Sequence, residues 1–149
     1  MGGIVEALNP LFNPRSVAVI GASRRDATIG NMFLQNLIEA GFEGTIHPVN
    51  PRADQVLGLP AVASIADLPR GVDLAVIAVP ADQVLGVVDE CAEAGVKTLL
   101  VVSAGFAEAD AEGAELQAEL VRRAHRSGMR VVGPNSFGLI NNDPAVRLN

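Results

Sequence analysis

The chain has 149 residues, which suits one domain, and its 49% of hydrophobic but 3% of aromatic residues predict a core of Val, Leu, Ile and Ala. A net charge of −6 and the scarcity of aromatic side chains argue against a nucleic-acid partner. A single cysteine, Cys91, excludes an internal disulfide, and no apolar run approaches the roughly 18 residues of a membrane span. The start of the chain lacks the features of a signal peptide, so we expect a cytoplasmic protein without a membrane partner.

Five short apolar runs alternate with helical patterns along the chain. The runs are predicted strands at residues 17–20, 45–49, 74–79, 98–102 and 130–132. Amphipathic helices are expected after the first, third and fourth runs, ending near Gly41, Gly95 and Gly128, and Asp110 is a candidate N-cap. The crossover around residues 64–68 is too short for a full helix. This alternation predicts an α/β fold with a Rossmann-like, doubly wound parallel sheet of five strands.

The last residues differ from the rest of the chain. Residues 137–149 have no clear hydrophobic periodicity. We therefore expect one domain at residues 1–136, followed by a connector at residues 137–149 that leads toward a missing domain.

Small or proline-containing turns follow every predicted strand. They are Gly21-Ala22-Ser23, Asn50-Pro51, Val79-Pro80, Ser103-Ala104-Gly105 and Gly133-Pro134-Asn135. In an open parallel sheet the carboxyl ends of the strands share one edge, and ligands bind there. The first turn also opens a helix, an arrangement whose backbone N–H groups and helix dipole bind phosphate. The sequence thus predicts a nucleotide site at this edge.

The first turn differs from the dinucleotide fingerprint G-x-G-x-x-G. Ser23 stands at the second glycine position, and the next glycine, Gly30, comes late. NAD-binding domains have an acid at the end of the second strand, which binds the ribose hydroxyls, but Asn50 stands there in this chain. An asparagine followed by Arg52 tolerates or attracts a ligand phosphate instead. Arg24 and its neighbour Arg25 could pair with a pyrophosphate.

The sequence offers no nucleophile with a base beside it. His47 and His125 lack partners at metal-ligand spacing, so no metal is expected. Cys91 falls on the apolar stripe of a helix, and Glu108 belongs to a group of acids that complement the dipole of the last long helix. No serine lies in a G-x-S-x-G elbow. We therefore expect a domain that binds a nucleotide without catalysing a reaction by itself.

Several motifs resemble one enzyme family. Residues 11–23, L-F-x-P-R-S-V-A-V-I-G-A-S, closely resemble the opening of NDP-forming acyl-CoA synthetases, which include ADP-forming acetyl-CoA synthetases. Later motifs match in the same order, namely Val49-Asn50-Pro51, Ala78-Val79-Pro80, Ser103-Ala104-Gly105-Phe106-Ala107-Glu108 and Gly133-Pro134-Asn135. The resemblance implies the CoA-binding domain that this family shares with the succinyl-CoA synthetase alpha subunit. Residues 143–149 look like the family's run toward its next domain.

The resemblance also implies a set of site residues, all in turns that follow strands. The CoA phosphates would be held by Gly21, Ala22, Ser23 and Arg24, and the adenosine end by Asn50, Pro51 and Arg52. The pantetheine arm would be bordered by Val79, Pro80, Val102, Ser103 and Ala104. The thiol would lie toward Asn135 and Ser136. The family often has Cys or Thr where Ser136 stands. The phosphohistidine of such enzymes belongs to a later domain, and neither histidine here matches it.

The leading hypothesis is that this domain positions CoA, or acyl-CoA, for thioester formation with an acyl phosphate in an NDP-forming acyl-CoA synthetase. Its partners would then be later domains or a partner subunit with an ATP-grasp fold. Three alternatives stay open: the CoA-binding module of a GNAT-type protein acetyltransferase fusion, a free-standing CoA-binding protein without catalysis, and, less favoured, an NAD(P)-binding domain.

Overall fold

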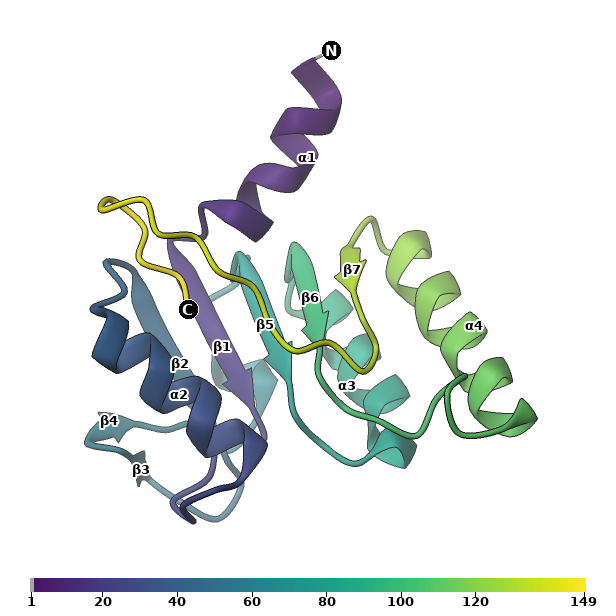
Figure 1. Ribbon diagram of the computed structural model, residues 1–149, viewed down its shortest axis with the longest axis horizontal. Coiled ribbons are helices and arrows are strands. Elements are labelled where there is room, and N and C mark those ends of the chain that lie inside the picture. The colour runs from purple at the N-terminus through teal and green to yellow at the C-terminus, as the bar shows by residue number, and fades with distance from the viewer. Residues whose placement is uncertain (1) are drawn as a thin grey trace.

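The computed structural model describes residues 2–149 and contains a five-stranded sheet in which every pair of neighbouring strands is parallel. The strands are β1 (Ser16–Ile20), β2 (Thr45–Val49), β5 (Leu74–Ile77), β6 (Thr98–Val101) and β7 (Arg130–Val132). Their order across the sheet is β2-β1-β5-β6-β7 (Figure 1). The predicted α/β fold is confirmed. β5 and β6 end before the predicted runs do, because the chain leaves the sheet to form turns.

Helices cover both faces of the sheet. α2 (Ile29–Ala40) lies on one face, and α3 (Ala81–Glu93) and α4 (Ala111–Arg126) lie on the other (Figure 1). As predicted, α2 ends at Gly41, which has a φ of 70°, and the side chain of Asp110 caps α4 by accepting from the N–H of Gly113 at 2.8 Å. The short crossover holds a 3₁₀ turn, η1 (Ile65–Asp67), as its length predicted.

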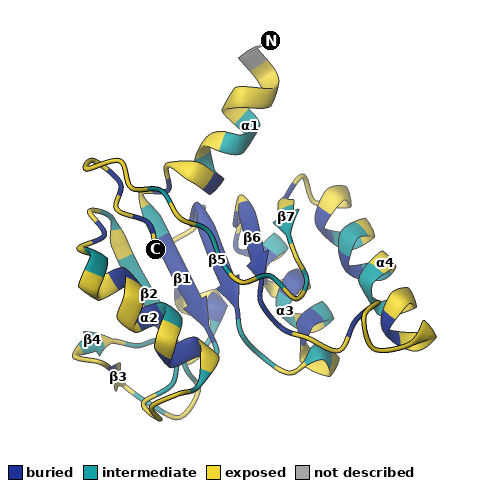
Figure 2. Cartoon of the chain, in the orientation of Figure 1, coloured by how far each residue is buried: buried dark blue, intermediate teal, exposed yellow. Residues whose placement is uncertain are grey.

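The three central strands, β1, β5 and β6, are buried on both faces, which explains their nearly continuous apolar sequences (Figure 2). Successive residues of β1 point to opposite layers: Ala18 packs with α3 and α4, whereas Val19 packs with α2. Cys91 lies in the α3 layer as predicted, and burial, with a smaller effect from Glu90, raises the pKa of its thiol to about 12. Pro48 lies in β2, an edge strand, where a missing N–H is tolerated.

One helix and one hairpin have no counterpart among the predicted elements. α1 (Gly2–Phe12) contains Pro10 and begins with two glycines, and it projects from the body of the domain (Figure 1). β3 (Gln55–Val56) and β4 (Leu59–Pro60) form an antiparallel hairpin of two-residue strands, too short for a period to show. Within residues 2–149, no helix is both long and apolar enough to cross a membrane.

Residues 137–149 cross the face of the sheet that α2 also covers (Figure 1). Val146 and Leu148 are buried there, and Asn141 forms an antiparallel bridge with Leu148. The side-chain amide of Asn141 donates to the backbone oxygen of Phe12 at 2.6 Å. The segment therefore contributes to the packing of this domain, and its role as a connector stays a prediction.

The first turn of α2 lies directly against the end of β1. Gly21 has a φ of 89°, and a Cβ there would clash with the backbone oxygen of Ala78. A Cβ at Gly30, in the first turn of α2, would overlap the carbonyl group of Gly21. Close packing of helix on strand is the role of the third glycine in the dinucleotide fingerprint. Gly30 fills this role here, although it comes later in the sequence.

We expect Gly30→Ala to destabilise the protein by about 1–3 kcal/mol, because the new methyl group must displace backbone rather than a flexible side chain. Gly86→Ala is the matched control. A Cβ at Gly86 meets nothing within 4 Å, so alanine there should stabilise α3 by roughly 0.5–1 kcal/mol. Urea unfolding of both variants measures the difference. Equal effects would contradict the close approach of α2 to Gly21.

Candidate functional site

The strand order places a switch point beside β1. The chain passes from β1 to β2 on one side, and its next sheet strand, β5, lies on the other side of β1. Ligands of open α/β sheets bind outside the carboxyl ends of the strands at such a point. The turns after β1 and β5 therefore flank the position where this fold presents a ligand.

Two adjoining grooves lie at this edge. The larger groove, about 730 Å³, is lined by the turns after β1, β2 and β5, and its lining includes Gly21, Ala22, Ser23, Arg24, Arg25, Asn50, Pro51, Arg52, Val79 and Pro80. The smaller groove, about 380 Å³, extends toward β6 and is lined in part by Val102, Ser103 and Ala104. The structure thus brings together every candidate residue except Asn135 and Ser136. Their contact with a ligand stays a prediction, as it does for the others.

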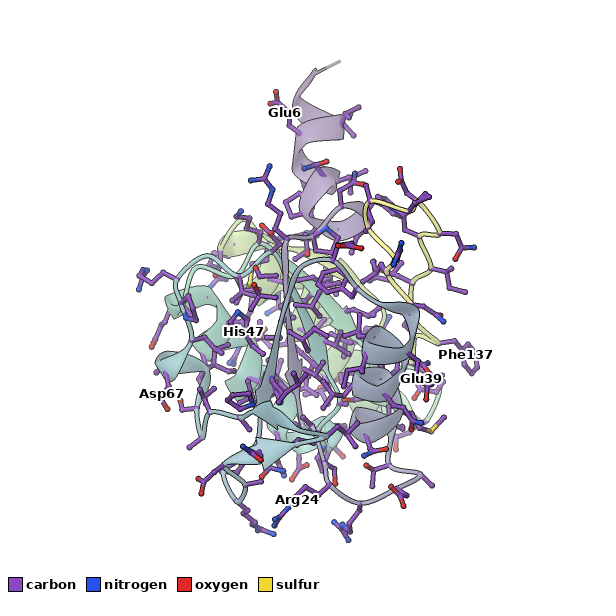
Figure 3. The ribbon with its side chains drawn as sticks, turned by 90° about the vertical axis from the view of Figure 1, so that its left-hand side faces the viewer. Glu6, Arg24, Glu39, His47, Asp67 and Phe137 are labelled. Atoms are coloured by element: carbon purple, nitrogen blue, oxygen red, sulfur yellow. The ribbon has the colours of Figure 1, made fainter. Side chains whose placement is uncertain are left out.

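Among the residues that the structure describes, all the charged side chains lining the larger groove are arginines: Arg24, Arg25 and Arg52. All three are exposed, and none forms an ion pair within residues 2–149. Figure 3 shows Arg24 extending away from the body of the protein at this edge. A chain with a net charge of −6 therefore holds a local cluster of positive charge where a phosphate ligand would bind.

The turn after β1 leaves backbone donors free. Within residues 2–149, no protein group accepts a hydrogen bond from the N–H of Ser23 or of Arg24. The Ser23 hydroxyl accepts from the N–H of Arg25 at 3.0 Å, and Thr28 caps the start of α2. Free N–H groups beside a helix N-terminus are an anion site.

Two asparagines hold this turn from either side. Asn50 donates from Nδ2 to the backbone oxygen of Ala22 and accepts at Oδ1 from the N–H of Arg52, both at 2.7 Å. Asn31 donates from Nδ2 to the backbone oxygen of Ser23 at 2.8 Å, and only 2% of Asn31 is exposed. Asn31 was not among the predicted site residues, although a polar residue one turn before Leu34 on the buried side of α2 is a usable signal.

Ser103, a candidate for the pantetheine arm, lies beside the thiol-side candidates Asn135 and Ser136. Ser103 is buried, and its hydroxyl donates to the backbone oxygen of Val79 at 2.5 Å, which joins the ends of β5 and β6. Asn135 donates from its N–H to the backbone oxygen of Ser103 at 3.0 Å, and the hydroxyl of Ser136 accepts from the N–H of Gly138. These two residues sit beside Ser103 at the end of β7 but do not line either groove.

Residues 15–142 match the family described as CoA binding domain. The chain belongs to that family. The resemblance found in the motifs and the expected cofactor, coenzyme A, are thereby confirmed for this CoA-binding domain. Within residues 2–149, no group of three or more His, Cys, Asp or Glu side chains is placed to hold a metal ion.

Similar proteins are ADP-forming acyl-CoA ligases. ADP-forming acetate–CoA ligase I of Archaeoglobus fulgidus is 46% identical over 136 residues, which cover 91% of this chain and 20% of that protein. The alpha subunit of ADP-forming acetate–CoA ligase I of Pyrococcus furiosus is 44% identical over 138 residues, which cover 90% of this chain and 30% of the subunit.

One solved structure is similar to this chain in both sequence and fold. The dinucleotide forming acetyl-coenzyme A synthetase 1 of Candidatus Korarchaeum cryptofilum, in complex with phosphate and ADP, is 51% identical with a TM-score of 0.88. The match covers 95% of this chain and 30% of that chain. The CoA-binding domain described here therefore spans 20–30% of the length of these relatives.

Glu108 has a more specific role than the sequence analysis gave it. It precedes α4, and its Oε1 accepts from the N–H of Gly105 at 2.6 Å and from the N–H of Phe106 at 3.1 Å. These bonds hold the turn that carries Ser103 and Ala104 into the smaller groove. The Gly105 N–H is the main cause that holds the pKa of the Glu108 carboxyl below its ordinary value of 4.5.

Because folding lowers the pKa of Glu108, its stabilisation of the turn is present above pH 4.5 and is lost as the pH falls through the lowered pKa. We expect the amide chemical shifts of Gly105 and Phe106 to titrate below pH 4.5 in the wild type. In Glu108→Gln the neutral side chain removes that titration. A transition of the same size in both proteins would show that Glu108 does not hold the turn.

Proposed function

We propose that this CoA-binding domain is part of an ADP-forming acyl-CoA synthetase and that it positions CoA for attack on an acyl phosphate. The proposal rests chiefly on the larger groove, in which free backbone N–H groups and three arginines meet at the switch point of the sheet. Diphosphate and the 3′-phosphate of CoA are the groups that such a surface attracts. The relatives, which are ADP-forming ligases, support the parent activity.

In the proposed reaction the CoA thiol attacks the acyl carbon of an acyl phosphate. A carbon–sulfur bond forms, the carbon–oxygen bond to phosphate breaks, and the thiol proton passes to the departing phosphate or to solvent. Among the described residues that line the two grooves, none has a side chain suited to act as the base, because the charged side chains there are arginines. The contribution of this domain is then orientation, which lowers the entropic cost of bringing thiol and acyl phosphate together.

The rest of the reaction belongs to other parts of the proposed enzyme. Phosphoryl transfer would be carried out by later domains or by a partner subunit, for which the resemblance implies an ATP-grasp fold. The proposed location is the cytoplasm, a reducing compartment in which the CoA thiol stays free. The ADP-forming ligases named above give no support to the three alternatives in the sequence analysis.

We expect CoA to bind the 149-residue chain in a 1:1 ratio and more tightly than NADH does, as measured by isothermal titration calorimetry. Arg52→Ala should weaken CoA binding by roughly threefold to tenfold, since an exposed arginine–phosphate contact is partly screened by solvent and salt. The effect should shrink as the salt concentration rises.

Arg130→Ala is the matched control, because Arg130 is also exposed but begins β7 at the opposite edge of the sheet. It should leave the dissociation constant for CoA unchanged. Tighter binding of NADH than of CoA, or equal losses in both variants, would refute the proposed site.

A further inference from the structure

The turn after β1 depends on two side chains that reach it from different elements. Asn31 comes from α2, and Asn50 comes from the end of β2. Each donates a hydrogen bond from Nδ2 to a backbone carbonyl of the turn, at 2.8 and 2.7 Å. The accepting carbonyls belong to two successive residues, Ser23 and Ala22.

The geometry of the peptide bond links these carbonyls to the free donors. In a trans peptide the C=O of one residue and the N–H of the next point in opposite directions. Holding the carbonyl of Ala22 therefore fixes the direction of the Ser23 N–H, and holding the carbonyl of Ser23 fixes that of the Arg24 N–H. Neither of these N–H groups has a protein acceptor within residues 2–149. Both residues line the larger groove.

We propose that Asn31 and Asn50 are positioning residues of the CoA site, which hold the Ala22 and Ser23 carbonyls so that the N–H groups of Ser23 and Arg24 face the diphosphate. This inference rests on the function proposed above. The two side chains act on the ligand through the backbone, not by touching it. A turn fixed before the ligand arrives binds more tightly, because less conformational entropy is lost on binding.

Asn50 also connects the two phosphate-facing turns. Its Oδ1 accepts from the N–H of Arg52 while its Nδ2 holds Ala22, so one side chain sets the turn after β1 and the turn after β2 together. Dinucleotide-binding folds place an acid at this position, where it binds ribose hydroxyls. Here both polar atoms of the side chain are committed to backbone partners, and the position serves the phosphate site instead.

The test compares CoA with pantetheine, which lacks the diphosphate and the adenosine. The affinity of the 149-residue chain for each ligand is measured by isothermal titration calorimetry, and the amide chemical shifts of Ser23 and Arg24 show whether CoA binds at this turn. We expect Asn31→Ala and Asn50→Ala each to weaken CoA binding by roughly threefold to tenfold, the effect of one lost hydrogen bond. The affinity for pantetheine should not change in either variant, since it does not use these N–H groups.

Asn50→Asp separates the two bonds of Asn50. A carboxylate can still accept from the N–H of Arg52 but cannot donate to Ala22, so we expect a loss of CoA affinity at least as large as in Asn50→Ala. Asn36→Ala is the control, because Asn36 lies exposed on α2. It should bind both ligands as the wild type does.

The outcomes separate this inference from the proposed function. If the wild type binds no CoA, or binds it without shifting Ser23 and Arg24, the site itself is wrong. If the wild type binds CoA there and folded Asn50→Ala binds it equally well, the positioning role alone is overturned. Should Asn31→Ala fail to fold, the two Asn50 variants decide the question. An equal loss of CoA and pantetheine affinity would show general damage and would also overturn it.

Discussion

The contact between the first turn of α2 and the backbone of Gly21 is the constraint on which the carboxyl edge of the sheet depends. Two glycines meet there: a side chain at Gly30 would push helix and strand apart, and one at Gly21 would strike the backbone oxygen of Ala78 at the end of β5. The contact brings the N-terminus of α2 to the tip of β1, where its free N–H groups add to those of the turn. It also brings Asn31 close enough to hold the carbonyl of Ser23. The proposed phosphate site and the packing of α2 thus depend on the same close approach.

In the described part of the chain, polar groups at the amino ends of the strands have protein hydrogen-bond partners, whereas some of those at the carboxyl ends do not. At the amino edge the Asp73 carboxylate accepts from Lys97 Nζ at 2.6 Å and from the N–H of Arg15 at 2.8 Å, and the hydroxyl of Thr98 donates to the Asp73 backbone oxygen. Those groups are satisfied by the protein itself. At the carboxyl edge the N–H groups of Ser23 and Arg24 have no such partner within residues 2–149. Polar groups that the fold leaves unsatisfied mark the edge where a ligand can replace water.

The sequence predicted most of the sheet, because strands buried on both faces read as continuous apolar runs, as in β1 and β6. The end of α2 at Gly41 and the start of α4 at Asp110 were predictable from the local residue types. α1 and the β3–β4 hairpin were not predicted, since their sequences carry little periodicity. The turns that line the grooves were predictable because parallel strands end at one edge. The partners of Asn31, Asn50 and Ser103 were not, because the carbonyls they bind are brought near only by tertiary packing.

The distribution of charge, rather than its sum, explains how an acidic chain can present a surface that attracts phosphate. On α4, Arg122 and Arg123 pair with Glu119, and Arg123 also pairs with Asp89, so their charge is largely neutralised where it stands.

Arg24, Arg25 and Arg52 have no carboxylate partner within the described residues, and the groove they line contains no acid. Their field therefore acts on whatever anion enters. Because guanidinium groups stay protonated at physiological pH, this surface can attract and orient a phosphate ligand but cannot take a proton from a thiol. The charges at this edge therefore suit the proposed role of binding and orientation.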